Sequence, residues 1–119
     1  MSRRITLLVL ALLVLGGLFL TLRPDPQAAR DQSFDLNITG GKLTPSQITV
    51  GEGDRVTLRI TADKDMELHL HGVDREIEVE SGETQEITFE ATPSGGFPIE
   101  DHGTEAQLGR LVIQPREGS

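Results

Sequence analysis

The sequence predicts an all-β fold, an antiparallel β-sandwich preceded by one N-terminal transmembrane helix. Three observations support this prediction. Residues 5–22 contain no charged side chain, whereas the chain beyond Asp31 is rich in charge. Beyond Asp31, apolar side chains recur at every second position, which is the period of a half-buried strand. Gly, Pro and acidic residues interrupt these runs about every 8–12 residues, as the turns of a sandwich do.

The apolar stretch at residues 5–22 lies between Arg3-Arg4 and Arg23. A helix of this length rises about 27 Å, which approaches the thickness of the hydrocarbon core of a membrane. A cleaved signal peptide is the alternative, but its apolar region usually has about 7–15 residues and ends at a small-residue cleavage site. The nearest such site, Gln27-Ala28-Ala29, is a poor match and lies well beyond the apolar run. We therefore expect residues 1–23 to be an uncleaved anchor.

The arginine pair before the anchor predicts the side of the membrane on which the rest of the chain lies. Arg3 and Arg4 favour the cytoplasmic side, so we expect a single-pass protein of the inner (cytoplasmic) membrane with its C-terminal domain on the extracytoplasmic, periplasmic side. Residues 24–33 are polar and indicate a linker, and residues 34–116 are expected to form the sandwich. Its alternating apolar runs lie at residues 34–38, 48–50, 56–60, 66–70, 77–79, 87–89 and 111–113.

Charge and composition exclude several classes of partner and chemistry. From Asp31 onward the chain has 7 Lys and Arg against 18 Asp and Glu, a formal charge of −11, compared with −8 for the whole chain. Such an acidic domain does not favour nucleic acid or an anionic lipid surface. The chain has no cysteine, so it has neither disulfides nor a reactive thiolate.

The order of motifs resembles the cupredoxin family. The stretches that match are LTPSQITVGEGDRVTLRI (43–60), ESGETQEITFEATPSGGFPIEDH (80–102) and LGRLVIQP (108–115). The resemblance covers residues 34–115 and is strongest to the cupredoxin-like domains of periplasmic iron-uptake lipoproteins and to the copper domain of terminal oxidases. It implies a Greek-key β-sandwich and, in the family, a copper site at one end of it.

The copper ligands that the resemblance implies are not retained in this chain. A type 1 copper site needs a cysteine thiolate beside two histidines. The family's cysteine position falls on Ile99 or Asp101, its axial methionine on Gln107, and its first histidine near Met66. Only His102 lies near a family ligand position. A blue-copper or two-copper electron-transfer centre is therefore excluded.

A different metal site is predicted from the stretch ELHLHGVD at residues 67–74. If Leu68 and Leu70 face the core, His69 and His71 share the opposite face, about 7 Å apart along the strand. Two histidines spaced in this way can hold a transition metal, and the family arrangement places His102 at the same end of the domain. We expect copper, or alternatively zinc. The predicted ligands are His69, His71 and His102, with Met66 as a soft ligand for Cu⁺ and Glu67, Asp74, Glu100 or Asp101 as oxygen ligands.

Two other interpretations of these residues stay open. The histidines can be water-facing strand residues without a metal, or they can titrate as proton sensors. The alternating acids Glu76, Glu78 and Glu80 indicate protection of a sheet edge. The Asp-His pair in IEDHG lacks a serine or cysteine nucleophile, so we expect no enzyme. The sequence thus predicts a membrane-anchored, extracytoplasmic binding module for a metal ion, or alternatively a metal-free protein-interaction or accessory module whose partner it does not reveal.

Overall fold

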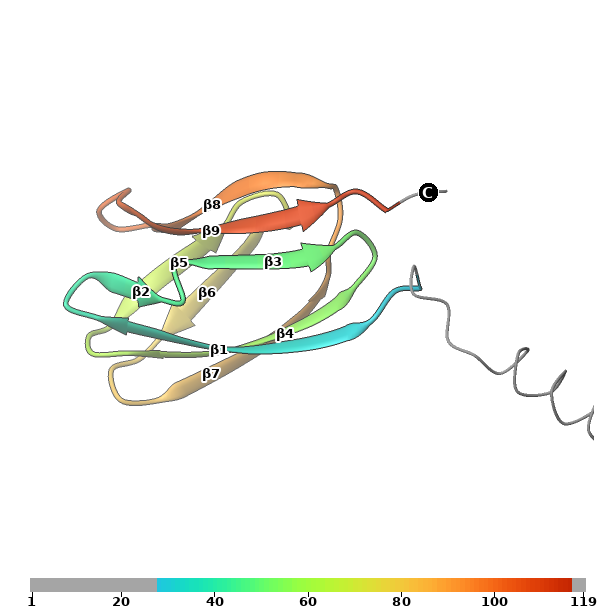
Figure 1. Ribbon diagram of the computed structural model, residues 1–119. Coiled ribbons are helices and arrows are strands. Elements are labelled where there is room, and N and C mark those ends of the chain that lie inside the picture. The colour runs from blue at the N-terminus through green and yellow to red at the C-terminus, as the bar shows by residue number, and fades with distance from the viewer. Residues whose placement is uncertain (1–27, 117–119) are drawn as a thin grey trace, which may run out of the picture.

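Alternating apolar residues form nine strands in the computed structural model, which describes residues 28–116 (Figure 1). The all-β prediction is confirmed for this part of the chain. In chain order the strands are β1 (Asp31–Thr39), β2 (Lys42–Thr44), β3 (Gln47–Gly51), β4 (Arg55–Ala62), β5 (Met66–Leu70), β6 (Arg75–Val79), β7 (Thr84–Glu90), β8 (Gly95–Asp101) and β9 (Gln107–Gln114).

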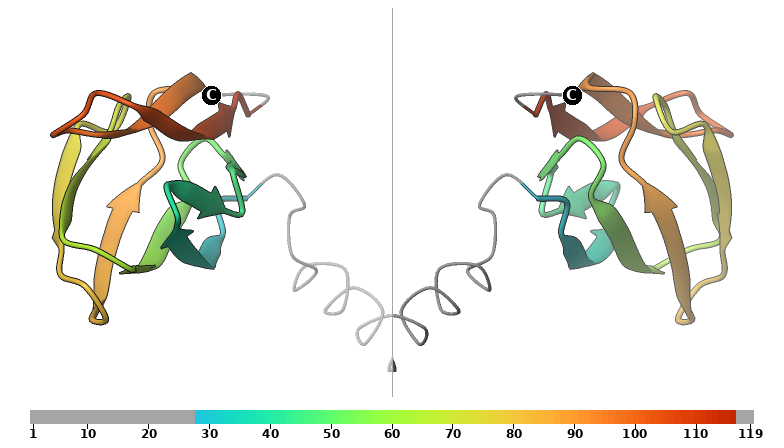
Figure 2. Two further views of the ribbon diagram at one scale, coloured as in Figure 1. Left: turned by 90° about the vertical axis from the view of Figure 1, so that its left-hand side faces the viewer. Right: turned by 90° about the vertical axis from the view of Figure 1, so that its right-hand side faces the viewer.

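The strands form two sheets that face each other (Figures 1 and 2). One has the order β2-β1-β4-β7 and the other the order β3-β9-β8-β5-β6. Two neighbouring pairs, β1 with β4 and β3 with β9, are parallel, so the prediction of a purely antiparallel sandwich is wrong for them. The chain crosses to the second sheet as β3 and returns as β4 beside β1, and a crossover of this kind leaves the two strands running in the same direction.

The core lies between the sheets and is built from the inward-facing residue of every apolar alternation. Burial of these side chains stabilises the folded state by roughly 25 cal/mol for each Å² of apolar surface removed from water. The largest fully buried side chains are Leu36, Ile38, Ile48, Val50, Val56, Leu58, Ile60, Leu68, Leu70, Ile99, Leu111 and Ile113.

The strands that the sequence did not predict are β2 and β8. Strand β8 begins with Gly95-Gly96 and contains Pro98, and these residue types are depleted in strands. Pro98 is tolerated because the pairing of β8 with β5 covers only Ile99 to Asp101. At its start, β1 begins at Asp31 and so includes the last three residues of the segment expected to be a linker.

The N-terminal end of the described chain is held close to its C-terminal end. Arg116 donates from Nε to the carbonyl oxygen of Glu52 at 2.8 Å and from Nη1 to that of Ala28 at 2.9 Å. Its Nη2 contacts the carboxylate of Asp54. Both described ends therefore lie at one end of the sandwich, and the loop after β8 lies at the other (Figure 1). The anchor predicted at residues 1–23 falls outside the described residues.

Asp54, in the turn before β4, is a buried carboxylate with a complete set of donors. Its oxygens accept hydrogen bonds from the backbone N–H of Arg30 at 2.9 Å, from that of Gly51 at 2.8 Å and from Gln32 Nε2 at 2.7 Å, besides Arg116. Burial raises the pKa of Asp54, but these hydrogen bonds and the charge of Arg116 outweigh it and hold the pKa below its ordinary value.

Within residues 28–116, no helix is long and apolar enough to cross a bilayer.

Candidate metal centre

The histidine pair lies on the outer face of β5, between β6 and β8. Leu68 and Leu70 are fully buried, and the alternation of the strand turns His69 outward, as predicted. His71 directly follows the strand. The centroids of the two rings are 4.1 Å apart, which is less than the roughly 7 Å rise of the strand between the two residues, so the rings lean toward each other. The angle between the ring planes is 37°.

Gly72 turns the chain from β5 back into β6. It has a φ of +86°, and a Cβ at this position would lie 2.4 Å from carbon atoms of the Phe97 ring, so no other residue fits here without displacing that ring. The turn sets the register of the hairpin, in which His69 lies opposite Glu76. Opposite residues of an antiparallel pair project to the same face, so the Glu76 carboxylate is brought beside the His69 imidazole.

His102 reaches the same face from the loop after β8. Its backbone N–H donates to the carbonyl oxygen of Glu67 at 2.8 Å, which fixes the start of the loop against β5. The ring of His102 is then 6.4 Å from that of His69, centroid to centroid, and nearly perpendicular to it at 73°. The strand missing from the prediction, β8, is thus what positions the third histidine.

Three of these side chains converge. One ligand atom each from His69, Glu76 and His102 lies within 4.8 Å of the other two. Ligands bound tetrahedrally to one ion at about 2.0–2.1 Å are roughly 3.4 Å apart, so the three side chains need to close by little more than 1 Å. Glu76 and His102 are exposed, which leaves them free to rotate.

The other expected histidine, His71, is held by a different carboxylate. Its Nε2 lies 3.0 Å from Glu100 Oε2, and it does not belong to the convergent group. His69 Nε2 lies 3.3 Å from Oδ1 of Asp74, in the turn that Gly72 opens. Carboxylates bonded to a ring nitrogen orient metal-binding histidines in proteins, so Asp74 is placed to hold the ring of His69.

Comparison with known proteins identifies the domain. The family model described as "Cupredoxin-like domain" matches residues 9–113. The chain belongs to this family. No curated protein matches the sequence.

Solved structures share the fold of this cupredoxin-like domain. A blue copper oxidase from Nitrosomonas europaea has a TM-score of 0.61 at 21% identity, over 75% of this chain and 40% of the oxidase. A chain of a heme-copper terminal oxidase dimer has a TM-score of 0.60 at 16% identity, over 95% of this chain and 100% of that one. A copper binding protein in the apo form has a TM-score of 0.59 at 12% identity, over 74% of this chain and 99% of that one. The chain thus spans less than half the length of the blue copper oxidase.

The donor set of this cupredoxin-like domain does not fit type 1 copper. The sequence has no cysteine, and at the positions expected for one the structure has Ile99, which is buried in the core, and Asp101. Two imidazoles and a carboxylate fit Cu²⁺ or Zn²⁺, which both accept nitrogen and oxygen ligands. The domain therefore has a cupredoxin-like fold without the type 1 ligands, and its group of candidate ligands lies on the outer face of one sheet.

The five additional ligands named from the sequence, Met66, Glu67, Asp74, Glu100 and Asp101, lie outside the convergent group. Met66 packs against the hydrophobic core, and Glu67 lies opposite Glu78. Asp101 is buried, and its Oδ1 accepts the N–H of Gly103 at 3.0 Å, so this carboxylate closes the loop that carries His102.

Glu76 is the ligand candidate that sequence reasoning missed. It was assigned to an acidic strand edge, and β6 is indeed the last strand of its sheet. The signal that could have found it is the length of the turn. Leu70 and Arg75 are opposite each other across residues 71–74, and counting one step back along each strand pairs His69 with Glu76.

Proposed function

We propose that this protein is a membrane-anchored, extracytoplasmic module that binds a divalent transition-metal ion, with Cu²⁺ as the preferred ion. The observation that carries the proposal is the convergence of His69, Glu76 and His102, whose ligand atoms lie within 4.8 Å of one another. Three separate segments supply these ligands, namely β5, the start of β6 and the loop after β8.

The chemistry of the ligands selects the oxidation state. Imidazole and carboxylate suit divalent ions, and at a site of this type Cu²⁺ binds more tightly than Zn²⁺. Cu⁺ prefers sulfur ligands, and the side chain of Met66 packs against the core instead of joining the group. Zn²⁺ is therefore the second candidate and Cu⁺ the weakest.

The acidic surroundings support a cation as the ligand. Carboxylates of Glu67, Glu78 and Glu100 lie on strands β5, β6 and β8 around the three converging side chains. The summed field of such a surface attracts cations and raises their local concentration. Among the proteins that share the fold, one is described as a copper binding protein and others as copper oxidases, which agrees with copper as the ion.

We propose a binding role and no catalysis. The group offers three ligands and leaves the remaining coordination positions of the ion open to water or to a ligand from a partner. With residues 1–23 as the anchor, the loop that carries His102 would point away from the membrane, since both described ends lie at the opposite end of the sandwich (Figure 1). A site in this position suits the capture of a metal ion and its transfer to another protein.

The experiment is a titration of the full-length protein in nonionic detergent with Cu²⁺ and, separately, Zn²⁺, followed by thermal unfolding. A ligand that binds only the folded state stabilises it by about 2.7 kcal/mol at a free concentration of 100 times Kd. We expect Cu²⁺ to raise the free energy of unfolding of the wild type by this amount. At the same metal concentration, His69→Ala, His102→Ala and Glu76→Gln are expected to show little or no stabilisation.

The matched controls come from the same surface. His71→Ala removes the neighbouring imidazole and Glu78→Gln removes the next carboxylate along β6, and both are expected to keep the stabilisation by Cu²⁺. The proposal would be refuted if Cu²⁺ did not stabilise the wild-type protein. It would also be refuted if His71→Ala abolished the stabilisation by Cu²⁺ and His102→Ala left it intact.

A further inference from the structure

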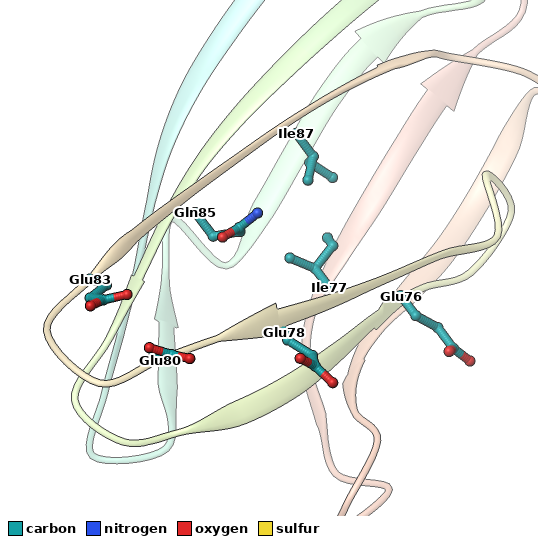
Figure 3. A pocket seen from close by; sticks show the side chains of 7 residues that line it. All are labelled: Glu76, Ile77, Glu78, Glu80, Glu83, Gln85 and Ile87. Atoms are coloured by element: carbon teal, nitrogen blue, oxygen red, sulfur yellow. The ribbon is translucent and has the colours of Figure 1, made fainter.

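A groove separates β6 from β7 on one side of the sandwich. Each is the last strand of its sheet, so two sheet edges face each other there. Arg75 closes one end of the groove, because its Nη2 donates to the carbonyl oxygen of Thr88 at 2.8 Å, and the β6–β7 turn closes the other. We call this cavity of about 310 Å³ the acidic groove (Figure 3). Its lining residues are Glu76, Ile77, Glu78, Glu80, Glu83, Gln85 and Ile87.

The floor of the acidic groove contains two isoleucines and one glutamine. Ile77 from β6 points across the groove toward Gln85 and Ile87 of β7 (Figure 3). Ile77 is buried, whereas Ile87 is only partly buried and packs against the edge of the core. A side chain that entered the groove would therefore meet apolar surface and one amide.

The lining of the groove carries only negative charge, and the positive charge of Arg75 lies at its closed end. All its charged lining residues are glutamates, namely Glu76, Glu78, Glu80 and Glu83. A hydrogen bond with Glu83, together with the negative charges of Glu83, Asp65 and Glu78, raises the pKa of Glu80. These acids repel one another, and a cationic ligand would relieve that repulsion.

We infer that the acidic groove binds a short extended segment of a partner protein in which Lys or Arg alternates with an aliphatic residue. An added strand projects alternate side chains to opposite sides, so one set can reach the glutamates while the other reaches Ile87. From Glu76 to Glu80 the rim spans about 13 Å, which sets the length at roughly five residues. A second copy of this acidic chain would bring like charges together and is not the occupant.

The inference is tested with a fluorescent five-residue peptide, Lys-Val-Lys-Val-Lys, whose binding to the full-length protein is followed by anisotropy. A metal chelator is present, so the outcome is independent of the metal site. Glu-Val-Glu-Val-Glu reverses the charge, and Lys-Gly-Lys-Gly-Lys keeps the charge without the aliphatic side chains. We expect the Lys-Val peptide to bind at least tenfold more tightly than either.

Variants locate the peptide on the protein. The triple variant Glu78→Gln, Glu80→Gln, Glu83→Gln is expected to weaken binding about tenfold, since each exposed charge pair contributes modestly. Ile87→Thr is expected to reduce affinity toward that of the glycine peptide. Glu86→Gln is the matched control, because Glu86 lies outside the groove lining, near Arg59 on the neighbouring strand, and this variant should bind normally.

Three results would overturn the inference. The first is no binding of the Lys-Val peptide by the wild type, and the second is equal binding of the Lys-Gly peptide, which would reduce the acids to protection of the sheet edge. The third is unchanged affinity in the triple variant. None of these results bears on the metal titration, because Glu76 is left intact and no metal is present.

Discussion

Two groups of polar side chains in this domain differ in their burial. Near the chain ends, Asp54 is buried and each of its oxygens accepts hydrogen bonds, from Arg116 among others. On the outer face of the other sheet, His69, Glu76 and His102 converge while partly or fully exposed. Each group contains a carboxylate, Asp54 in the first and Glu76 in the second. The role of each group is therefore decided by burial and by hydrogen-bond partners, and not by residue type.

The difference follows from the cost of removing charge from water. A buried carboxylate is stable only when donors replace its hydration, and once Asp54 has them it has no capacity left for a ligand. Exposed side chains keep their hydration and can exchange it for a metal ion at low cost. The first group therefore contributes to folding stability, the second is the one we propose for binding, and substitutions should separate the two effects.

The largest effect is expected from Asp54→Ala. The substitution removes the carboxylate that Arg116 and the backbone N–H groups of Arg30 and Gly51 share, and breaking a buried charge pair in this way costs about 3–5 kcal/mol. Chemical denaturation measures the loss. Whatever fraction stays folded should still be stabilised by Cu²⁺, and loss of the metal response in folded Asp54→Ala would show that the two regions are not independent.

The two faces of β5 provide the next comparison. Leu68 is fully buried and His69 beside it is 21% exposed at its side chain. Leu68→Ala is expected to cost about 2–5 kcal/mol through the cavity it leaves, whereas His69→Ala without metal should cost less than about 1 kcal/mol. Equal losses in denaturant unfolding would mean that His69 has a structural role.

Part of the fold and part of the candidate site could be predicted from the sequence. The alternation of apolar residues predicted the sandwich, because burial of one strand face is a local property that the sequence displays directly. The same alternation placed His69 on the outer face, since Leu68 and Leu70 could only face inward.

Pairing between strands was beyond local reasoning. Nothing within β1 or β4 indicates that they lie parallel to each other, and the glycines and proline of β8 conceal a strand whose neighbours stabilise it. The candidate site depends on this pairing. Because β8 was not predicted, strand pairing gave no position for Glu100, and only the family resemblance placed His102 at this end of the domain. Without the hairpin register, Glu76 was assigned to edge protection alone.

Acid should reduce the contribution of Asp54 and its hydrogen-bond partners to the free energy of unfolding. The pKa of Asp54 is held below its ordinary value in the folded protein, so its contribution to stability is complete above the unfolded value of about 3.9 and is lost as pH falls through the lower folded value. Unfolding free energies between pH 6 and pH 2.5 should show a steeper acid loss in wild type than in Asp54→Ala. Parallel curves would contradict this assignment.

The smallest effect is expected on the strand edge. Glu67 and Glu78 lie directly opposite each other on β5 and β6, and like charges so placed are destabilising. Glu78→Gln should therefore stabilise the metal-free protein by about 0.2–1 kcal/mol, and the gain should shrink as salt is added. Thermal melts at low and high ionic strength measure it, and a destabilised variant would show that Glu78 makes a favourable contact instead.

We propose that His69 and His102, and not the adjacent pair His69 and His71, bind the metal ion. Pulsed electron paramagnetic resonance of the Cu²⁺-loaded protein counts the imidazoles bound to the ion. We predict two in the wild type, two in His71→Ala, and one or none in His69→Ala and in His102→Ala. A spectrum that loses an imidazole in His71→Ala and is unchanged in His102→Ala would contradict the account.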